Sequence, residues 1–256
     1  MELLAGKTGV VTGGSSGIGR AIAIAFARHG ADVVVADVQE EPREGDVATH
    51  ELVRTETDAG SSFVRCDVTD NEDIERAVDA AEEFGGIDVM VNNAGILGDE
   101  SFPHTSEATY RRIMDVNVKG VYFGSQIAGR RLVERGGGAI VNMSSTAGLK
   151  GDADHPIYNA SKAAVRIMTY SLAEELGPDG VRVNAIHPGF IDTEMNVEDF
   201  PILGTEREEE ARLNIPVRRV GTPGEVANAA LFLASDLSSF VNASSIVVDG
   251  GSTYTG

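Results

Sequence analysis

Seven short runs of apolar and β-branched residues recur along this 256-residue chain, and segments with the apolar spacing of helices separate them. Strands that alternate with helices in this way form a parallel sheet with helices on both of its faces. The runs occupy residues 8–12, 32–36, 62–66, 87–91, 138–143, 181–186 and 245–248. The sequence therefore predicts an α/β fold built on a doubly wound parallel sheet of seven strands.

Two short patterns mark where helices begin. Thr69 and Glu72 have the spacing of a capping box that opens a helix, and so do Thr222 and Glu225, with Pro223 at the first helical position. No Ser/Gly-rich linker interrupts the alternation of strands and helices. A hydrophobic content of 42% is enough for one core at this length, so we expect a single domain over residues 1–256.

A glycine-rich turn joins the first predicted strand to the first predicted helix. Residues 12–19 read Thr-Gly-Gly-Ser-Ser-Gly-Ile-Gly, with the glycine spacing G-x-x-x-G-x-G. Glycines allow a sharp turn and let backbone amides approach a pyrophosphate at the positive end of a helix. Because strand, turn and helix follow one another here, the pattern indicates a dinucleotide site. A turn that binds no ligand is the alternative.

Asp37 ends the second predicted strand, about 20 residues beyond the glycine turn. A carboxylate at this position can bind both hydroxyls of the adenosine ribose and would repel a 2′-phosphate. The turn also contains no Lys or Arg before Arg20. These features predict NAD rather than NADP, although Asp37 could also be an ordinary acidic loop residue.

Tyr158 and Lys162 stand four residues apart in a predicted helix, which places both side chains on one helical face. A neighbouring ammonium favours the phenolate, and lowering the phenol pKa by roughly three units requires about 4 kcal/mol. A tyrosine with such a pKa can exchange a proton with an alcohol or ketone oxygen at neutral pH. The pair alone is weak evidence, since the same spacing occurs on many solvated helices.

Together with the turn and the Tyr-Lys pair, several segments resemble the short-chain dehydrogenase/reductase family. The resemblance runs from about residue 6 to Gly251 and includes Asn92-Asn93-Ala94-Gly95 and a serine thirteen residues before Tyr158. It implies a Rossmann-type domain with the catalytic residues Asn117, Ser145, Tyr158 and Lys162. The cofactor-binding residues that it implies are Gly13, Ser15, Ser16, Gly17, Ile18, Gly19, Asp37, Asp67, Val68, Asn93, Ala94, Gly95, Tyr158, Lys162, Pro188, Gly189, Ile191 and Thr193.

The resemblance also implies the role of each catalytic group in hydride transfer between NAD and an alcohol or carbonyl substrate. Tyr158 exchanges the proton, and Ser145 positions the reacting oxygen. Lys162 lowers the Tyr158 pKa and binds the nicotinamide ribose, while Asn117 holds a water that links Lys162 to solvent. The family forms homotetramers or homodimers, in which the helices over residues 117–132 and 158–176 pair across subunits.

Residues 190–221 are the least patterned part of the chain and match the family's substrate lid. Apolar lid residues either line the substrate or pack the lid on the body, and the sequence leaves both interpretations open. They are Met195, Phe200, Ile202 and Leu203. His155, like Asp152 and Asp154, is expected at the surface or at the rim of the substrate site.

Two other functions compete with this interpretation. A 3-oxoacyl thioester reductase is the alternative among enzymes, because the Tyr-x-Ala-Ser-Lys segment also occurs there. Asp37 argues against it, since biosynthetic reductases mostly use NADPH. A non-catalytic dinucleotide-sensing regulator belongs to a different class, but it has no need of the serine, tyrosine and lysine together.

Charge and cysteine content indicate which binding partners and which cellular compartment to expect. The net charge is −19, from 40 acidic and 21 basic residues, and only four residues are lysines. Such a surface should repel nucleic acid and anionic membranes. An acidic, lysine-poor surface is also typical of halophilic proteins, and the alternative is that the protein is an ordinary acidic enzyme. No apolar run of about 18 residues and no signal peptide is seen. Cys66 is expected to be a buried thiol in a reducing cytoplasm, and no metal-ligand spacing occurs.

Overall fold

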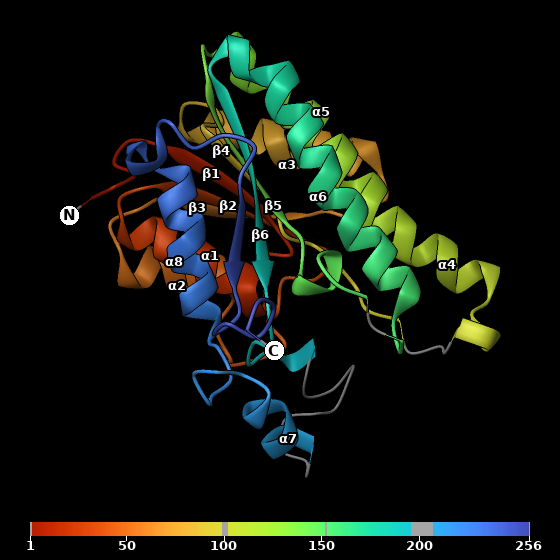
Figure 1. Cartoon of the computed structure of the whole chain (residues 1–256). Helices are drawn as coiled ribbons and strands as arrows, with labels where there is room; N and C mark the ends of the chain where they lie inside the picture. Colours follow the sequence, from red (N-terminus) through yellow and green to blue (C-terminus); the bar gives the residue numbers. More distant parts are fainter. Residues whose placement is uncertain (1, 99–101, 152, 196–206, 256) are drawn as a thin grey trace.

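The computed structural model describes residues 2–98, 102–151, 153–195 and 207–255, and its centre is one sheet of parallel strands (Figure 1). The strands are β1 Thr8–Thr12, β2 Asp32–Asp37, β3 Ser61–Arg65, β4 Val89–Asn92, β5 Gly138–Met143, β6 Val181–Pro188 and β7 Ser245–Val248. Their order across the sheet is β3-β2-β1-β4-β5-β6-β7, and every neighbouring pair is parallel. The predicted doubly wound seven-stranded sheet is confirmed.

Helices cover both faces of the sheet (Figure 1). One face carries α1 Gly17–Arg28, α2 Thr49–Glu56 and α8 Pro223–Ala234, and the other carries α3 Asn71–Asp79, α5 Gly120–Glu134 and α6 Pro156–Leu176. The remaining helices are α4 Glu107–Met114, α7 Arg207–Leu213, a π-helix at Asp115–Lys119 and 3-10 helices at Ala80–Phe84, Phe102–His104, Thr146–Gly148, Gly177–Asp179 and Asp236–Ser238.

The strands are buried on both faces, and their alternating residues build two separate cores. Val11, Val33 and Val35 point toward α1 and α8, whereas Val10 and Val34 point toward α3 and α5. Successive side chains of a strand face opposite sides of the sheet, so a strand that is covered on both sides must be apolar throughout. This is why the β-branched runs were visible in the sequence.

The chain winds outward in one direction from β1 to β3 and in the other from β4 to β7, so the winding reverses between β1 and β4. In a sheet of this kind, the loops at the carboxyl ends of the strands diverge at the reversal and leave a crevice for a ligand. The glycine-rich turn follows β1 and the Asn92–Gly95 segment follows β4. Both segments therefore lie at the reversal point.

Of the two predicted capping boxes, one is confirmed and one is wrong. Thr222 and Glu225 form a reciprocal box at the start of α8, where Pro223 is the first residue. The other helix, α3, begins one residue later than expected, because Asp70 is its N-cap and accepts a hydrogen bond from the Glu72 amide at 3.0 Å. The Thr69 hydroxyl instead donates to Asp67 Oδ1 at 2.8 Å. Thr and Asp are both good N-cap residues, but the Thr69 hydroxyl is already bonded to Asp67, so Asp70 caps the helix.

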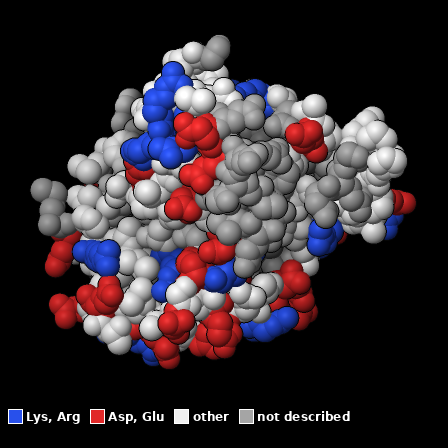
Figure 2. Space-filling model, turned by 90° about the horizontal axis from the view of Figure 1, so that it is seen from below, with Lys and Arg blue, Asp and Glu red and all other residues white. Residues whose placement is uncertain are grey.

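The acidic side chains lie mainly at the surface. On the face shown in Figure 2, Asp and Glu side chains are spread among Lys and Arg rather than gathered in one patch. Cys66 is 2% exposed, and burial raises the pKa of its thiol to about 12, so it is an unreactive structural thiol. Among the described residues, we find no helix with the length and apolarity needed to cross a membrane.

Candidate active site

The four predicted catalytic residues come together beside the carboxyl ends of β4 and β5. Ser145 follows β5, and Tyr158 and Lys162 lie in the first two turns of α6. A Cβ atom on Gly95, just after β4, would lie 3.2 Å from Lys162 Nζ and 3.4 Å from Asn117 Oδ1. The glycine is therefore what allows the β4 loop to pass this close to Lys162 and Asn117.

Tyr158, Ser145 and Lys162 form one connected group. The Tyr158 hydroxyl shares a hydrogen bond with the Ser145 side chain. Lys162 Nζ lies 5.6 Å from the centroid of the Tyr158 ring and donates to the Met143 carbonyl at 3.0 Å. Ser145 Oγ also accepts a hydrogen bond from the Ala147 amide at 3.1 Å, which fixes its side chain at the start of the short helix after β5.

The protonation of this group differs from the sequence-based expectation. Burial raises the pKa of Tyr158, and the hydrogen bond from Ser145 offsets only part of that rise. Burial also lowers the pKa of Lys162 to about 8. The expected lowering of the Tyr158 pKa by Lys162 is therefore wrong for the protein without cofactor, because desolvation disfavours both charged forms. At neutral pH Tyr158 is a phenol, the form that donates a proton.

The two adjacent serines after β5 have different surroundings. Ser144 is 3% exposed, and its hydroxyl donates to the Lys162 carbonyl at 2.8 Å, so it joins β5 to α6. Ser145 is half-buried and faces Tyr158. The choice of the second serine from its spacing to Tyr158 thus agrees with the geometry.

Asn117 lies in the π-helix between α4 and α5 and is fully buried. Its Oδ1 accepts from the Ile96 amide at 2.8 Å, and its Nδ2 donates to the Ile96 carbonyl at 2.9 Å and to Ser161 Oγ at 3.1 Å. The side chain therefore ties the β4 loop to α6. The water-holding role that the resemblance implies stays a prediction.

A series of hydrogen-bonded polar groups behind Ser145, from buried His187 to half-buried Arg166, was not predicted from the sequence. His187, in β6, is fully buried; its Nδ1 lies 3.0 Å from the Ser145 carbonyl and its Nε2 lies 2.8 Å from Ser245 Oγ. Ser245 Oγ lies 2.7 Å from the Tyr170 hydroxyl, which accepts from Arg166 Nε at 2.9 Å. The only signal in the sequence was a histidine at the end of a predicted strand, and Arg182 and Asn184 in the same strand are also polar.

Donor and acceptor rules fix the tautomer of His187. The Ser145 carbonyl can only accept, so Nδ1 carries the proton and donates to it. In a neutral ring Nε2 must then accept, so Ser245 donates its one proton to His187 Nε2 and accepts from the Tyr170 hydroxyl, which itself accepts from Arg166. Burial lowers the pKa of His187, which keeps the ring neutral as this arrangement requires. This series of hydrogen bonds, from Arg166 to His187, holds the Ser145 backbone in place.

The glycine-rich turn is held by the segment after β4. Asn93 Nδ2 donates to the carbonyls of Thr12 and Gly13 at 3.0 and 3.1 Å, and the Ala94 amide donates to Thr12 Oγ1 at 3.1 Å. A Cβ atom on Gly13 would lie only 2.9 Å from Asn93 Nδ2. The segment after β4 therefore supports the turn from behind, and only glycine fits at position 13.

The remaining residues of the turn lead into α1. Ser16 is the N-cap residue of α1, and Gly17, Ile18 and Gly19 form its first turn. The Ser15 amide donates to Asp37 Oδ2 at 3.0 Å, and burial raises the Asp37 pKa despite this bond and those from the following amides. The carboxylate predicted to hold a ribose thus lies directly against the turn.

The segment after β6 faces the same turn. Gly189 donates its amide to the Val248 carbonyl at 2.9 Å, which fixes the Pro188-Gly189 bend against β7. Ile191 is 3% exposed and pairs with Gly221. A Cβ atom on Gly17 would lie 3.5 Å from Thr193 Cγ2, so Thr193 stands opposite the start of α1.

Asp67 and Val68, which the resemblance places among the cofactor-binding residues, have a mainly structural environment. Asp67 Oδ1 accepts from the amide and the hydroxyl of Thr69. Val68 is 7% exposed and packs in the core, where a Cβ atom on Gly120 would lie 2.9 Å from its Cγ2. Any contact of Val68 with a cofactor would therefore have to come from its backbone.

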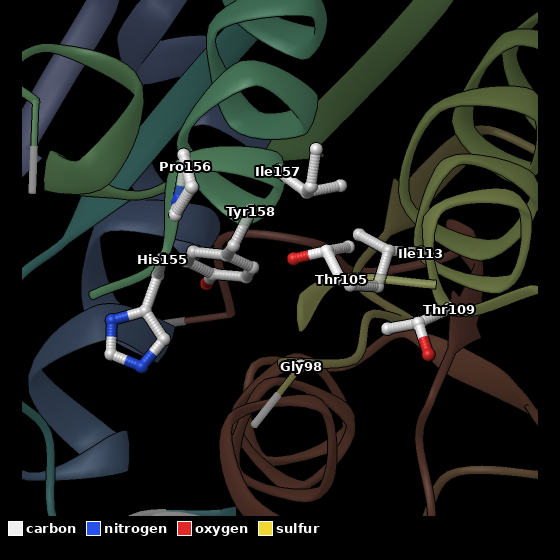
Figure 3. A pocket seen from close by; sticks show the side chains of 8 residues that line it. All are labelled: Gly98, Thr105, Thr109, Ile113, His155, Pro156, Ile157 and Tyr158. Atoms are coloured by element: carbon white, nitrogen blue, oxygen red, sulfur yellow. The ribbon is translucent and has the colours of Figure 1, made fainter. Parts of the chain in front are cut away.

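A small pocket opens beside Tyr158, between α6 and the segment around α4 (Figure 3). Its lining is Gly98, Thr105, Thr109, Ile113, His155, Pro156, Ile157 and Tyr158. His155 lies on this lining, which agrees with its predicted place at the rim, and Asp154 is exposed. Of the lid, Met195 is half-buried, whereas Phe200, Ile202 and Leu203 lie outside the described residues, as does Asp152.

The residues around the glycine-rich turn fit a dinucleotide. Gly13 and Gly17 have φ angles of +63° and +54°, values that L side chains rarely adopt. The Gly17 amide, at the positive end of α1, donates to the Glu44 carboxylate at 2.5 Å. This amide therefore already binds an anionic group, as a phosphate site would.

Comparison with known proteins gives consistent matches over almost the whole chain. Residues 13–253 match the family described as enoyl-(acyl carrier protein) reductase. A 3-oxoacyl-[acyl-carrier-protein] reductase of Chlamydia muridarum is 40% identical, with 98% of each chain covered, and an L-rhamnose 1-dehydrogenase (NAD(P)(+)) of Azotobacter vinelandii is 41% identical, with 97% of each covered. A solved short-chain type dehydrogenase/reductase from Mycobacterium marinum superimposes with a TM-score of 0.88 at 36% identity, covering 98% of this chain and 97% of that one.

Proposed function

The chain belongs to the short-chain dehydrogenase/reductase family of oxidoreductases, and we propose that it uses NAD to interconvert a small alcohol and its ketone or aldehyde. The observation that carries this proposal is the hydrogen-bonded group of Tyr158, Ser145 and Lys162 at the carboxyl end of β5. This group offers an acid, a second hydrogen bond to the same substrate oxygen, and a cation beside both.

The geometry supports a definite role for each side chain. In the direction of reduction, the Tyr158 phenol donates its proton to the carbonyl oxygen of the substrate while Ser145 holds that oxygen by a hydrogen bond. In oxidation the proton returns to Tyr158. When bound, the nicotinamide supplies or takes up the hydride. Lys162 gives one N–H to the Met143 carbonyl, and its remaining N–H groups can serve the nicotinamide ribose.

Asp37 supports NAD as the cofactor. Its carboxylate is held against the glycine-rich turn by the Ser15 amide, at the place where it can accept from the hydroxyls of an adenosine ribose and repel a 2′-phosphate. The turn offers no cation before Arg20 to bind such a phosphate. The Azotobacter relative carries both cofactors in its name, so the choice in this chain rests on Asp37.

A 3-oxoacyl thioester reductase is a second candidate function. The observation in its favour is the 40% identity to the Chlamydia enzyme over nearly the full length of both chains. The two candidates differ in the substrate, a thioester on a long carrier or a small free alcohol, and in the expected cofactor. No described feature favours a non-catalytic regulator, since the acid, the serine and the lysine are all in place.

The resemblance further leads us to propose a homotetramer or homodimer and a substrate lid over residues 190–221. Exposed apolar side chains on the two helices expected to pair support the assembly: Tyr122 on α5 is 44% exposed and Ile167 on α6 is 58% exposed. The acidic, lysine-poor surface supports a protein that works at high salt.

The test is a screen of NAD and NADP reduction over sugars, hydroxyacids, secondary alcohols and 3-hydroxyacyl thioesters, at low and high KCl concentration. We expect turnover with NAD and at least one free alcohol. Turnover with thioesters and NADP alone would establish the second candidate. An absence of turnover in every class would contradict the proposed enzyme activity.

A further inference from the structure

The loop between β2 and α2, residues 38–48, is largely exposed, but three of its residues make hydrogen bonds with the glycine-rich turn. Ser15 Oγ donates to the Gln39 carbonyl at 2.7 Å, and the Arg43 amide donates to Ser16 Oγ at 2.8 Å. Next to these bonds, the Gly17 amide donates to Glu44 Oε1 at 2.5 Å. Most of the loop is exposed, whereas the Glu44 side chain is half-buried against the start of α1.

The Gly17 amide is one of the groups that a phosphate would use. Gly17 is the first residue of α1, so its N–H has no acceptor within the helix and points out of the positive end of the helix dipole. Amides in this position bind phosphate and carboxylate groups alike. Glu44 therefore holds the amide with the same chemistry that a cofactor phosphate would bring.

We propose that Glu44 is an internal competitor of the cofactor's phosphate groups at the Gly17 amide, so that the β2–α2 loop sets the affinity for the dinucleotide and the rate of its release. The inference rests on the proposed function, because it takes the ligand to be NAD or NADP. For a phosphate to approach the amide, the carboxylate has to swing away, both to free the N–H and to remove the repulsion between two anions.

The Glu44 contact has the features of one that can be displaced. Its second carboxylate oxygen, Oε2, is buried, and no donor among the described residues reaches it. A buried carboxylate oxygen without a partner is unfavourable, and moving it into solvent restores its hydration. Gly45 follows with a φ of +80°, so the chain turns sharply directly after Glu44 at a residue without a side chain.

Two phosphate groups of different origin could displace Glu44. The pyrophosphate belongs to both NAD and NADP, whereas the 2′-phosphate belongs to NADP alone. Asp37, which accepts from the Ser15 amide of the same turn, already disfavours the 2′-phosphate. Comparing the two reduced cofactors therefore tells which phosphate group meets Glu44.

The test measures the Kd of NADH and of NADPH, by cofactor fluorescence, for the wild type, Glu44→Ala and Asp46→Ala. Asp46 is an exposed residue of the same loop, so its replacement removes the same charge without touching the Gly17 amide and serves as the matched control. We expect Glu44→Ala to bind about tenfold more tightly than Asp46→Ala, which corresponds to about 1.4 kcal/mol. Glu44→Gln, which keeps the size of the side chain without its charge, should fall between them.

An equal gain for both cofactors supports competition with the pyrophosphate, and a gain for NADPH alone supports competition with the 2′-phosphate. Without cofactor, Glu44→Ala should melt about 2–4 °C below Asp46→Ala, because α1 loses the anion at its start. A Glu44→Ala protein that binds cofactor like Asp46→Ala would overturn the inference. A wild type that binds neither cofactor would instead overturn the proposed function, and the inference with it.

Discussion

The buried Lys162 should make the stability of the protein depend on pH in a predictable direction. The side chain is 3% exposed, and burial lowers its pKa from 10.5 to about 8. At about 1.36 kcal/mol per pKa unit, this shift corresponds to about 3 kcal/mol. The folded state is destabilised by that amount as long as the lysine stays charged. Between pH 8 and 10.5 the unfolded chain keeps a proton that the folded chain has released. Stability from this group therefore rises with pH over that window, and the full penalty applies below pH 8.

The change Lys162→Met tests this directly, because methionine keeps the apolar stem and removes the charge. It also leaves the Met143 carbonyl without its donor, which costs about 1–3 kcal/mol and offsets much of the gain at pH 7. The difference between the two proteins is therefore best followed as a function of pH. We expect the wild type to gain up to about 3 kcal/mol relative to Lys162→Met between pH 7 and pH 10.

Urea unfolding at constant ionic strength, at pH 7, 8, 9 and 10, gives the free energies. Lys150→Met, at an exposed lysine, is the control for the general effect of losing one positive charge. A stability difference between wild type and Lys162→Met that stays constant from pH 7 to 10, or that shifts in favour of the variant, would refute the buried-ammonium argument. Lys162→Met should also lose turnover, whatever its stability.

Three other predictions concern cofactor choice, the support of Ser145, and salt. Replacing Asp37 by Ser together with Val38 by Arg should shift kcat/KM from NAD toward NADP; a wild type that already prefers NADP, or an unchanged ratio, would contradict the role of Asp37. His187→Leu should lower kcat by about tenfold or more with little change in the Kd for NADH. His187→Asn still offers a donor to the Ser145 carbonyl, so it should retain most of kcat. Equal losses of kcat in both variants would exclude a role of His187 in positioning Ser145. Raising KCl from 0.1 to 3 M should raise the melting temperature and the activity, because salt screens the repulsion between acidic side chains. The Debye length falls from about 10 Å at 0.1 M to about 3 Å at 1 M. A melting temperature that does not change with salt, with an intact assembly at the lowest salt, would argue against salt adaptation.

The elements that carry the fold could be predicted because their signals are local. β-branched runs marked strands that are apolar on both faces, and Tyr158 and Lys162 fell in a helix whose first residue is Pro156. The start of α3 was misplaced by one residue, because Thr69 and Asp70 are both good caps and only the position of Asp67 decides between them. The π-helix around Asn117 was not predicted, since no sequence period distinguishes it from the flanking α-helices.

The placement of Tyr158 and Lys162 on one helical face could be predicted from their spacing, but the interactions that change their pKa values could not. The pKa of Tyr158 depends on how deeply α6 buries it, and this outweighs the charge of Lys162 that the sequence displays. His187 reaches Ser145 and Ser245 across 42 and 58 residues of sequence, and Glu44 reaches Gly17 across 27. Such contacts are set by strand order and loop conformation, which a sequence pattern does not contain.

The central claim is that Tyr158 exchanges the proton during hydride transfer, and Tyr158→Phe tests it most directly. The change removes the hydroxyl and almost nothing else, so the Kd for NADH should stay within about threefold of wild type. The kcat for alcohol oxidation should fall by at least about 10²-fold, the lower end of what general acid–base catalysis contributes. The measurement is kcat on an alcohol found in the substrate screen, alongside the Kd from cofactor fluorescence. A Tyr158→Phe enzyme that keeps kcat within about threefold of wild type would contradict the assignment of Tyr158 and, with it, the proposed function of the site.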